Sequence, residues 1–132
     1  MSYAHFKRLP VKHIREKMKS RYKEKEPCYI CGARENIELH HLYSVSELFQ
    51  GWLRETGTKI NNDEDVLACR EQFISDYDEY LNNDNLYSLC KTHHLKLHSI
   101  YGKSYSNYMA RKVRVWIERQ REKHAEVASN KT

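Results

Sequence analysis

The chain has only four glycines and two prolines among its 132 residues, and it lacks any apolar run long enough to span a membrane. Its first residues also lack the apolar stretch of a signal peptide. We therefore expect a soluble intracellular protein without membrane contacts. A chain of this length should form one domain with a modest core, which a bound metal ion would strengthen.

Cysteine is also sparse, with four residues. In a reducing compartment, closely spaced cysteines and histidines are more typical of metal ligands than of disulfides. Three of the four cysteines and five of the eight histidines fall in two short segments, residues 28–41 and 85–98. These residues can be divided into a closed ligand set that would hold structure and an open set that could support chemistry.

The closed set consists of two pairs, Cys28 with Cys31 and Cys90 with His93, each with two residues between its members. Structural zinc is held by four thiolate or imidazole ligands of this kind. Gly32 follows the first pair and permits the tight turn of a zinc knuckle. The sequence therefore predicts a structural Zn²⁺ site, with free thiols in a reduced core as the alternative. Cys69 has no partner at ligand spacing and is expected to be a core thiol.

The open set contains His40, His41, His94 and His98. His94 and His98 lie four residues apart on an expected helix, so both rings project from one face and can bind one ion. His40 and His41 are neighbours on an expected strand, so their side chains point to opposite faces. So few protein ligands leave a position for water or a phosphate oxygen. Three other histidines are expected to be ordinary core or surface residues: His5, His13 and His124.

Hydrophobic spacing, capping residues and turn residues predict the elements around these segments. The fold class that we expect is α+β and mainly helical, with the two strands paired as a hairpin. The expected helices span about residues 10–24, 44–57, 63–81, 91–101 and 106–126, and the expected strands span residues 37–42 and 86–89.

The net charge of +5 is unevenly distributed. Residues 1–26 hold nine Lys/Arg against three acids, and residues 111–132 hold seven against three. Residues 46–84 show the reverse balance, with ten Asp/Glu against three Lys/Arg. Solvated helix faces explain many of the lysines, but basic segments on both sides of a metal site also favour a polyanionic partner such as DNA.

In residue type, order and local spacing, the segments Glu38–His41 and Asn85–His98 resemble the HNH endonucleases, which have the ββα-metal (His-Me finger) fold. The resemblance covers about residues 27–101, apart from a helical insertion. It implies one nuclease domain over residues 1–132. Its expected parts are a basic N-terminal helix within 1–26, a zinc-stapled ββα core at 27–102 with an insertion at about 44–82, and a basic C-terminal helix within 103–132.

The resemblance also implies residue roles. His41 would be the general base that takes a proton from the attacking water, which suits an imidazole that titrates near neutrality. Asn85 would hydrogen-bond the backbone of the loop and help to fix His41. His94 would be catalytic as a ligand, and it would bind a divalent ion (Mg²⁺, Mn²⁺, Ni²⁺ or Zn²⁺) together with His40 and His98.

Two positions depart from the family pattern. His40 stands where many relatives have Asp, a variant that the DNase colicins share. His93 stands where many zinc-bearing relatives have a fourth Cys. The Cys90–His93 spacing and the His94–His98 pair favour His93 as the fourth zinc ligand, with His94 as the alternative.

The function expected from the resemblance is metal-dependent hydrolysis of DNA phosphodiester bonds, by nicking or by double-strand cleavage, with 5′-phosphate and 3′-hydroxyl products. Duplex DNA is the expected partner, and an RNA or branched DNA substrate stays open. The expected location is the cytoplasm, of a bacterial host if the protein is phage-encoded. A non-catalytic, zinc-stapled nucleic-acid-binding module is the alternative function. The last helix could be core or a homodimer surface, and the candidate DNA-binding residues are Lys96, Arg111, Lys112 and Arg114.

Overall fold

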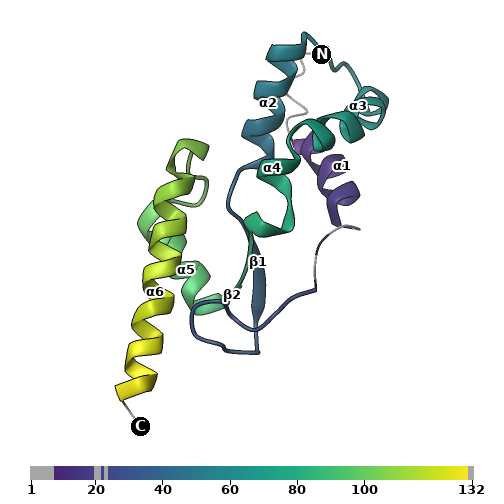
Figure 1. Ribbon diagram of the computed structural model, residues 1–132. Coiled ribbons are helices and arrows are strands. Elements are labelled where there is room, and N and C mark those ends of the chain that lie inside the picture. Colours follow the sequence, from purple (N-terminus) through teal and green to yellow (C-terminus); the bar gives the residue numbers. More distant parts are fainter. Residues whose placement is uncertain (1–7, 20–21, 23, 131–132) are drawn as a thin grey trace. The chain divides into compact units, whose positions relative to one another are not determined.

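The computed structural model describes residues 8–19, 22 and 24–130 (Figure 1). The described chain is mainly helical and contains one two-stranded antiparallel sheet, which confirms the expected α+β class. Its described residues divide into two compact units, one within residues 8–22 and 44–83 and the other within residues 24–43 and 84–130. The organisation of the chain as a single domain stays a prediction.

The first unit is helical. It contains α1 (Arg8–Lys19), α2 (Val45–Thr56), α3 (Asp63–Asp76) and α4 (Asp78–Leu81). The helix expected over about 10–24 begins earlier, at Arg8; residues 20, 21 and 23 lie outside the described part of the chain. The helices at 45–81 correspond to the expected insertion. Their buried side chains form one core with α1: Val11, Ile14, Met18, Val45, Phe49, Trp52, Ile60, Val66, Phe73, Ile74 and Leu81.

Helix α2 begins and ends where the sequence predicts. The Ser44 hydroxyl accepts a hydrogen bond from the Glu47 N–H at 3.2 Å, which satisfies one of the free donors of the first turn. Gly57 ends the helix with φ of 69°, a left-handed conformation that glycine adopts without steric cost. Local capping chemistry is therefore sufficient to set both ends.

The prediction of one continuous helix over 63–81 is wrong, because α3 ends at Asp76 and α4 begins at Asp78. Tyr77 between them has φ of −111° and ψ of 24°. Two contacts with α2 hold the chain at this point. Trp52 Nε1 donates to Asp76 at 2.8 Å, and the Tyr77 hydroxyl donates to Glu55 at 3.2 Å. These tertiary contacts favour the turned backbone over helix continuation.

The second unit is a hairpin followed by two helices. Strand β1 (Ile37–His41) pairs antiparallel with β2 (Leu86–Cys90), in a register that runs from Ile37 opposite Cys90 to His41 opposite Leu86. The short 3₁₀ turn η2 (Asn83–Asn85) leads into β2, and α5 (Lys91–Tyr101) follows β2 without a linker. The hairpin and the bounds of α5 thus agree with the predictions.

The last expected helix is divided into the 3₁₀ turn η3 (Asn107–Met109) and the long helix α6 (Ala110–Asn130). Helix α6 lies beside α5 in Figure 1. Leu97 of α5 packs in one core with Val113 and Ile117 of α6, and all three side chains are fully buried. This packing joins α6 to the strand–helix segment that carries the Cys and His residues.

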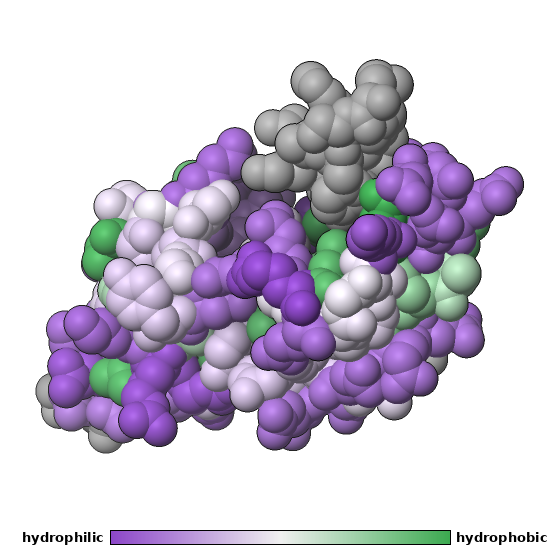
Figure 2. Space-filling model, turned by 90° about the horizontal axis from the view of Figure 1, so that it is seen from above, coloured by the Kyte–Doolittle hydropathy of each residue, from purple (hydrophilic) through white to green (hydrophobic). Residues whose placement is uncertain are grey.

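No helix among the described residues is long and apolar enough to cross a membrane. The face shown in Figure 2 is mainly hydrophilic, with small and scattered hydrophobic areas. Exposed large apolar residues include Leu95, Ile100 and Tyr108. Isolated apolar residues of this kind are ordinary on protein surfaces.

Phe73 is fully buried against Phe49 and Trp52, whose ring centroids lie 5.1 and 5.8 Å from its own. Phe73→Ala should lower the free energy of unfolding of the helical unit by about 3–5 kcal/mol, because it leaves a large cavity. Leu67→Ala on the same helix is the control; that side chain is 44% exposed, and its loss should cost less than about 0.5 kcal/mol. Urea unfolding followed by circular dichroism measures both, and equal losses would contradict this core.

Candidate metal centres

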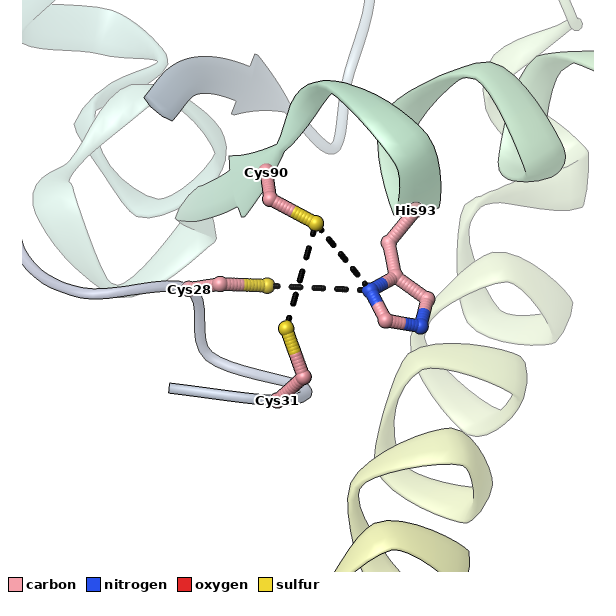
Figure 3. Close-up of side chains that lie close together, drawn as sticks. All are labelled: Cys28, Cys31, Cys90 and His93. Atoms are coloured by element: carbon pink, nitrogen blue, oxygen red, sulfur yellow. Dashed lines mark hydrogen bonds between the residues drawn. The ribbon is translucent and has the colours of Figure 1, made fainter. Parts of the chain in front are cut away.

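The structure brings the four residues of the predicted closed set together (Figure 3). Cys28 and Cys31 come from the loop before β1, Cys90 ends β2, and His93 lies in the first turn of α5. The Cys31 and Cys90 sulfurs are 3.9 Å apart. His93 Nδ1 lies 3.2 Å from the Cys90 sulfur and 4.0 Å from the Cys28 sulfur. All four ligand atoms are within 4.8 Å of one another.

These separations fit a tetrahedral metal ion. Zinc–sulfur and zinc–nitrogen bonds place two ligand sulfurs about 3.8 Å apart, and a sulfur and a nitrogen about 3.6 Å apart, at the tetrahedral angle. The distances of 3.9, 3.2 and 4.0 Å lie close to these values. Three thiols and one imidazole are also the donor types that zinc prefers over magnesium or calcium. The residues present therefore suit a structural zinc ion.

The loop that carries the first two cysteines is folded by its own backbone. The Cys28 N–H donates to the Ala33 carbonyl, and the Gly32 N–H donates to the Cys28 carbonyl, both at 2.8 Å. Gly32 has φ of 77°, which accounts for glycine at this position. Burial acts to raise the pKa of Cys28, but hydrogen bonds from the N–H groups of Cys90, Cys31 and Ile30 outweigh it and lower the pKa. These N–H groups favour the thiolate of Cys28, the form that binds metal, whereas burial raises the pKa of Cys31 in the same loop to about 11.

His93 has a second contact that the sequence does not predict. Its Nε2 lies 3.2 Å from Nε2 of His124 on α6. One ring nitrogen of His93 therefore faces the sulfurs while the other faces α6. Ligating histidines are commonly oriented by such a partner on the free nitrogen. No sequence pattern points to His124, because it lies 31 residues beyond His93 without a ligand-type spacing.

A second cluster contains the three predicted ion ligands His40, His94 and His98. His94 Nε2 lies 3.1 Å from His40 Nδ1 and 3.0 Å from His98 Nε2. These values are close to the spacing of about 3.3 Å expected between two imidazole ligands of one tetrahedral ion. His40 is 4% exposed, and His94 and His98 are half-buried on α5.

The other nitrogen of each ring has its own partner. His94 Nδ1 lies 3.0 Å from the Glu38 carboxylate, and His98 Nδ1 lies 2.9 Å from the Gly102 carbonyl. His40 Nε2 lies 2.9 Å from the Tyr105 hydroxyl, which itself lies 2.6 Å from the Leu42 carbonyl. Carboxylates and carbonyls only accept hydrogen bonds, so Nδ1 of His94 and of His98 carries the proton. The three other nitrogens are then left to converge on one another.

This arrangement calls for a cation. With Nδ1 of His94 and of His98 protonated and both rings neutral, their Nε2 lone pairs face each other at 3.0 Å, which is repulsive unless a positive charge lies between them. Burial, followed by the charges of His94, His98 and His41, lowers the pKa of His40 to about 3, so this ring is neutral near pH 7. Three neutral imidazoles can hold a divalent ion and leave a coordination position for a further ligand.

The remaining predicted catalytic residues lie at the same end of the hairpin. His41 is the last residue of β1 and is half-buried. Asn85 is buried, and its main-chain carbonyl accepts a hydrogen bond at 2.9 Å from the N–H of Leu42, the residue after His41. The Asn85 side chain accepts a hydrogen bond from Arg114 of α6. Asn85 therefore connects the segment after His41 to α6.

The four predicted DNA-binding residues have different surroundings. Lys96, Arg111 and Lys112 are exposed. Arg114 is half-buried, and it donates to Asn85 and, at 2.9 Å, to the Tyr87 hydroxyl. The structure thus engages the Arg114 guanidinium inside the second unit and leaves the other three cations at the surface.

The second unit thus carries two Cys/His clusters that could each hold a metal ion. The chain belongs to the phage T5 nicking endonuclease family, a nicking endonuclease family whose model matches residues 1–132. Membership implies an endonuclease, a hydrolase that acts on DNA. No solved structure matches the chain.

The cysteine cluster generates a metal prediction. The purified protein should carry one tightly held zinc per chain, and Cys28→Ser should lose both this zinc and the cooperative melting transition, because binding and folding are coupled in a small zinc-stapled fold. Cys69→Ser is the matched control, since Cys69 lies in the helical unit and donates to the Val66 carbonyl. Elemental analysis and calorimetry measure the two quantities. Full zinc content and an unchanged transition in Cys28→Ser would rule out this cluster as the zinc site.

Proposed function

We propose that this chain is an HNH-type endonuclease in which His40, His94 and His98 hold the catalytic divalent ion. The observation that carries the proposal is the convergence of three ring nitrogens whose opposite nitrogens already have partners. The strand–strand–helix order of β1, β2 and α5 supports it, since this is the order of the ββα-metal unit that the sequence resembles. Family membership independently supports DNA cleavage.

The roles proposed for the residues follow from their chemistry. When bound, the divalent ion supplies several kcal/mol of stabilisation to the charge that develops on the phosphoryl and leaving 3′ oxygens. His41 takes a proton from the attacking water, a role that suits an imidazole side chain. His41 already contributes to the lowered pKa of His40, so the two rings interact electrostatically. The main-chain carbonyl of Asn85 holds the chain after His41 by accepting the hydrogen bond from the Leu42 N–H.

The two sites differ in the metal that they favour. For the cluster of Cys28, Cys31, Cys90 and His93 we propose Zn²⁺, on the donor types and spacing described above. For the three histidines, neutral imidazoles favour Zn²⁺, Ni²⁺ or Mn²⁺, and the HNH resemblance adds Mg²⁺. The first ion is proposed to hold the fold and the second to serve hydrolysis.

A plasmid assay tests the catalytic proposal. Wild-type protein should convert supercoiled plasmid to the nicked form in Mg²⁺, Mn²⁺, Ni²⁺ or Zn²⁺. His41→Ala and His94→Ala should each slow this conversion by about 100-fold or more, because one removes the general base and the other a ligand of the ion. The zinc content and circular dichroism of both variants serve as controls for folding.

The same assay separates the proposal from its alternative. DNA binding by all three proteins without nicking in any of the metals would favour a non-catalytic binding module. Unchanged nicking by His94→Ala would reject the three-histidine ion site while leaving the family assignment in place. Competition by RNA or branched DNA would reveal a different preferred substrate.

The exposed cations generate a binding prediction. We propose that Arg111 and Lys112 contact phosphates, because both are exposed at the start of α6. Replacing both with Ala should reduce the slope of log affinity against log salt by about two for duplex DNA without added divalent ion. The double variant Arg54→Ala/Lys59→Ala removes the same charge from exposed positions of the acidic insertion, and it should leave the slope unchanged. Equal slopes for the two double variants would contradict the contact.

A further inference from the structure

Tyr105 lies between α5 and η3, and it is half-buried against the core of the second unit. Its hydroxyl contacts three groups of β1 and the residue after it. It lies 2.6 Å from the Leu42 carbonyl, 3.4 Å from the His41 carbonyl and 2.9 Å from His40 Nε2.

A count of protons decides how these contacts are made. A tyrosine hydroxyl has one proton to donate, and carbonyl oxygens can only accept. The shortest contact, to the Leu42 carbonyl, takes that proton. Toward His40 the hydroxyl oxygen can then only accept, so His40 Nε2 must carry the ring proton. His40 Nδ1 is left with a free lone pair directed at His94 Nε2.

We propose that Tyr105 is a positioning residue of the histidine ion site: its hydroxyl fixes the His40 tautomer so that Nδ1 faces the ion. The inference rests on the proposed function of the three histidines. Tyr105 does not touch the reacting atoms. It acts through His40, and it also holds the main chain at His41 and Leu42.

The tautomer matters because a competing hydrogen bond is available. His40 is 4% exposed, so removal of the Tyr105 hydroxyl would leave its Nε2–H buried without this acceptor. A buried donor without an acceptor carries a desolvation penalty. The ring can avoid this penalty by moving the proton to Nδ1. Nδ1–H could then donate to His94 Nε2, only 3.1 Å away. That hydrogen bond would occupy two of the three ligand nitrogens, and an incoming ion would have to break it.

The test compares Tyr105→Phe with Tyr101→Phe in the zinc-loaded protein. The ring centroids of Tyr101 and Tyr105 are 6.5 Å apart. The hydrogen bond described for the Tyr101 hydroxyl goes to the Lys112 carbonyl at 3.5 Å, so Tyr101→Phe removes a neighbouring hydroxyl that serves another contact. Co²⁺ is titrated into each protein, and the three-histidine site is recognised by visible absorption without a sulfur-to-cobalt band. We expect Co²⁺ affinity to fall about 10- to 100-fold in Tyr105→Phe and to stay unchanged in Tyr101→Phe.

The tautomer is measured directly by long-range proton–nitrogen NMR of the imidazole rings, with the His40 signals assigned from a His40→Ala spectrum. Wild-type protein without Co²⁺ should show the proton on His40 Nε2, and Tyr105→Phe should move it to Nδ1. A proton on Nδ1 in the wild-type protein would overturn the proposal, even if Tyr105→Phe failed to fold. Unchanged Co²⁺ affinity in a folded, zinc-loaded Tyr105→Phe would overturn it as well. If wild-type protein bound no Co²⁺ at all, the ion site itself would be refuted, which is a different result.

Discussion

The second unit depends on the meeting of two ligand pairs that are distant in sequence. The Cys31 and Cys90 sulfurs are 59 residues apart along the chain and 3.9 Å apart in space. The hairpin between them has only two strands, which is marginal for stability in water. Two backbone bonds support it, from the Tyr29 N–H to the Ser88 carbonyl at 2.8 Å and from the Lys91 N–H to the Asn36 carbonyl at 3.0 Å. The entropic cost of closing a loop grows only slowly with loop length. Binding of a structural zinc ion contributes about 10–16 kcal/mol of free energy. A metal site can therefore tolerate a long helical insertion between its two ligand pairs.

Elements governed by local chemistry could be predicted closely from the sequence. Ser44 and Gly57 set the ends of α2 because each acts within one turn of the helix. Helix α5 starts at Lys91 and ends at Tyr101 as expected, with Gly102 after it. The grouping of the candidate metal ligands could also be predicted. Two residues between ligands and a four-residue spacing on a helix are local sequence patterns that do not depend on the rest of the fold.

Contacts across the fold could not be predicted in this way. The break at Tyr77 depends on Asp76 and Tyr77 meeting α2, and the sequence of α3 and α4 alone favours a continuous helix. Tyr105 and His124 look like core and surface residues by spacing, and their contacts with His40 and His93 span 65 and 31 residues. The Gly102 carbonyl beside His98 is a main-chain group, so its contact with His98 cannot be predicted from residue type. The candidate ligands were therefore visible in the sequence, and the groups that contact their other ring nitrogens were not.

The step from His93 to His94 shows how little separates the two sites. Successive residues on a helix project about 100° apart, so neighbours can face different surroundings without any distortion. His93 turns Nδ1 to the sulfurs and Nε2 to His124, while His94 turns Nε2 to His40 and His98. Helix α5 begins directly after Cys90, with no linker to absorb a shift. A metal ion held by Cys90 and His93 would therefore fix the rotation and the position of the helix that presents His94 and His98, so that the structural cluster sets the geometry of the proposed catalytic one.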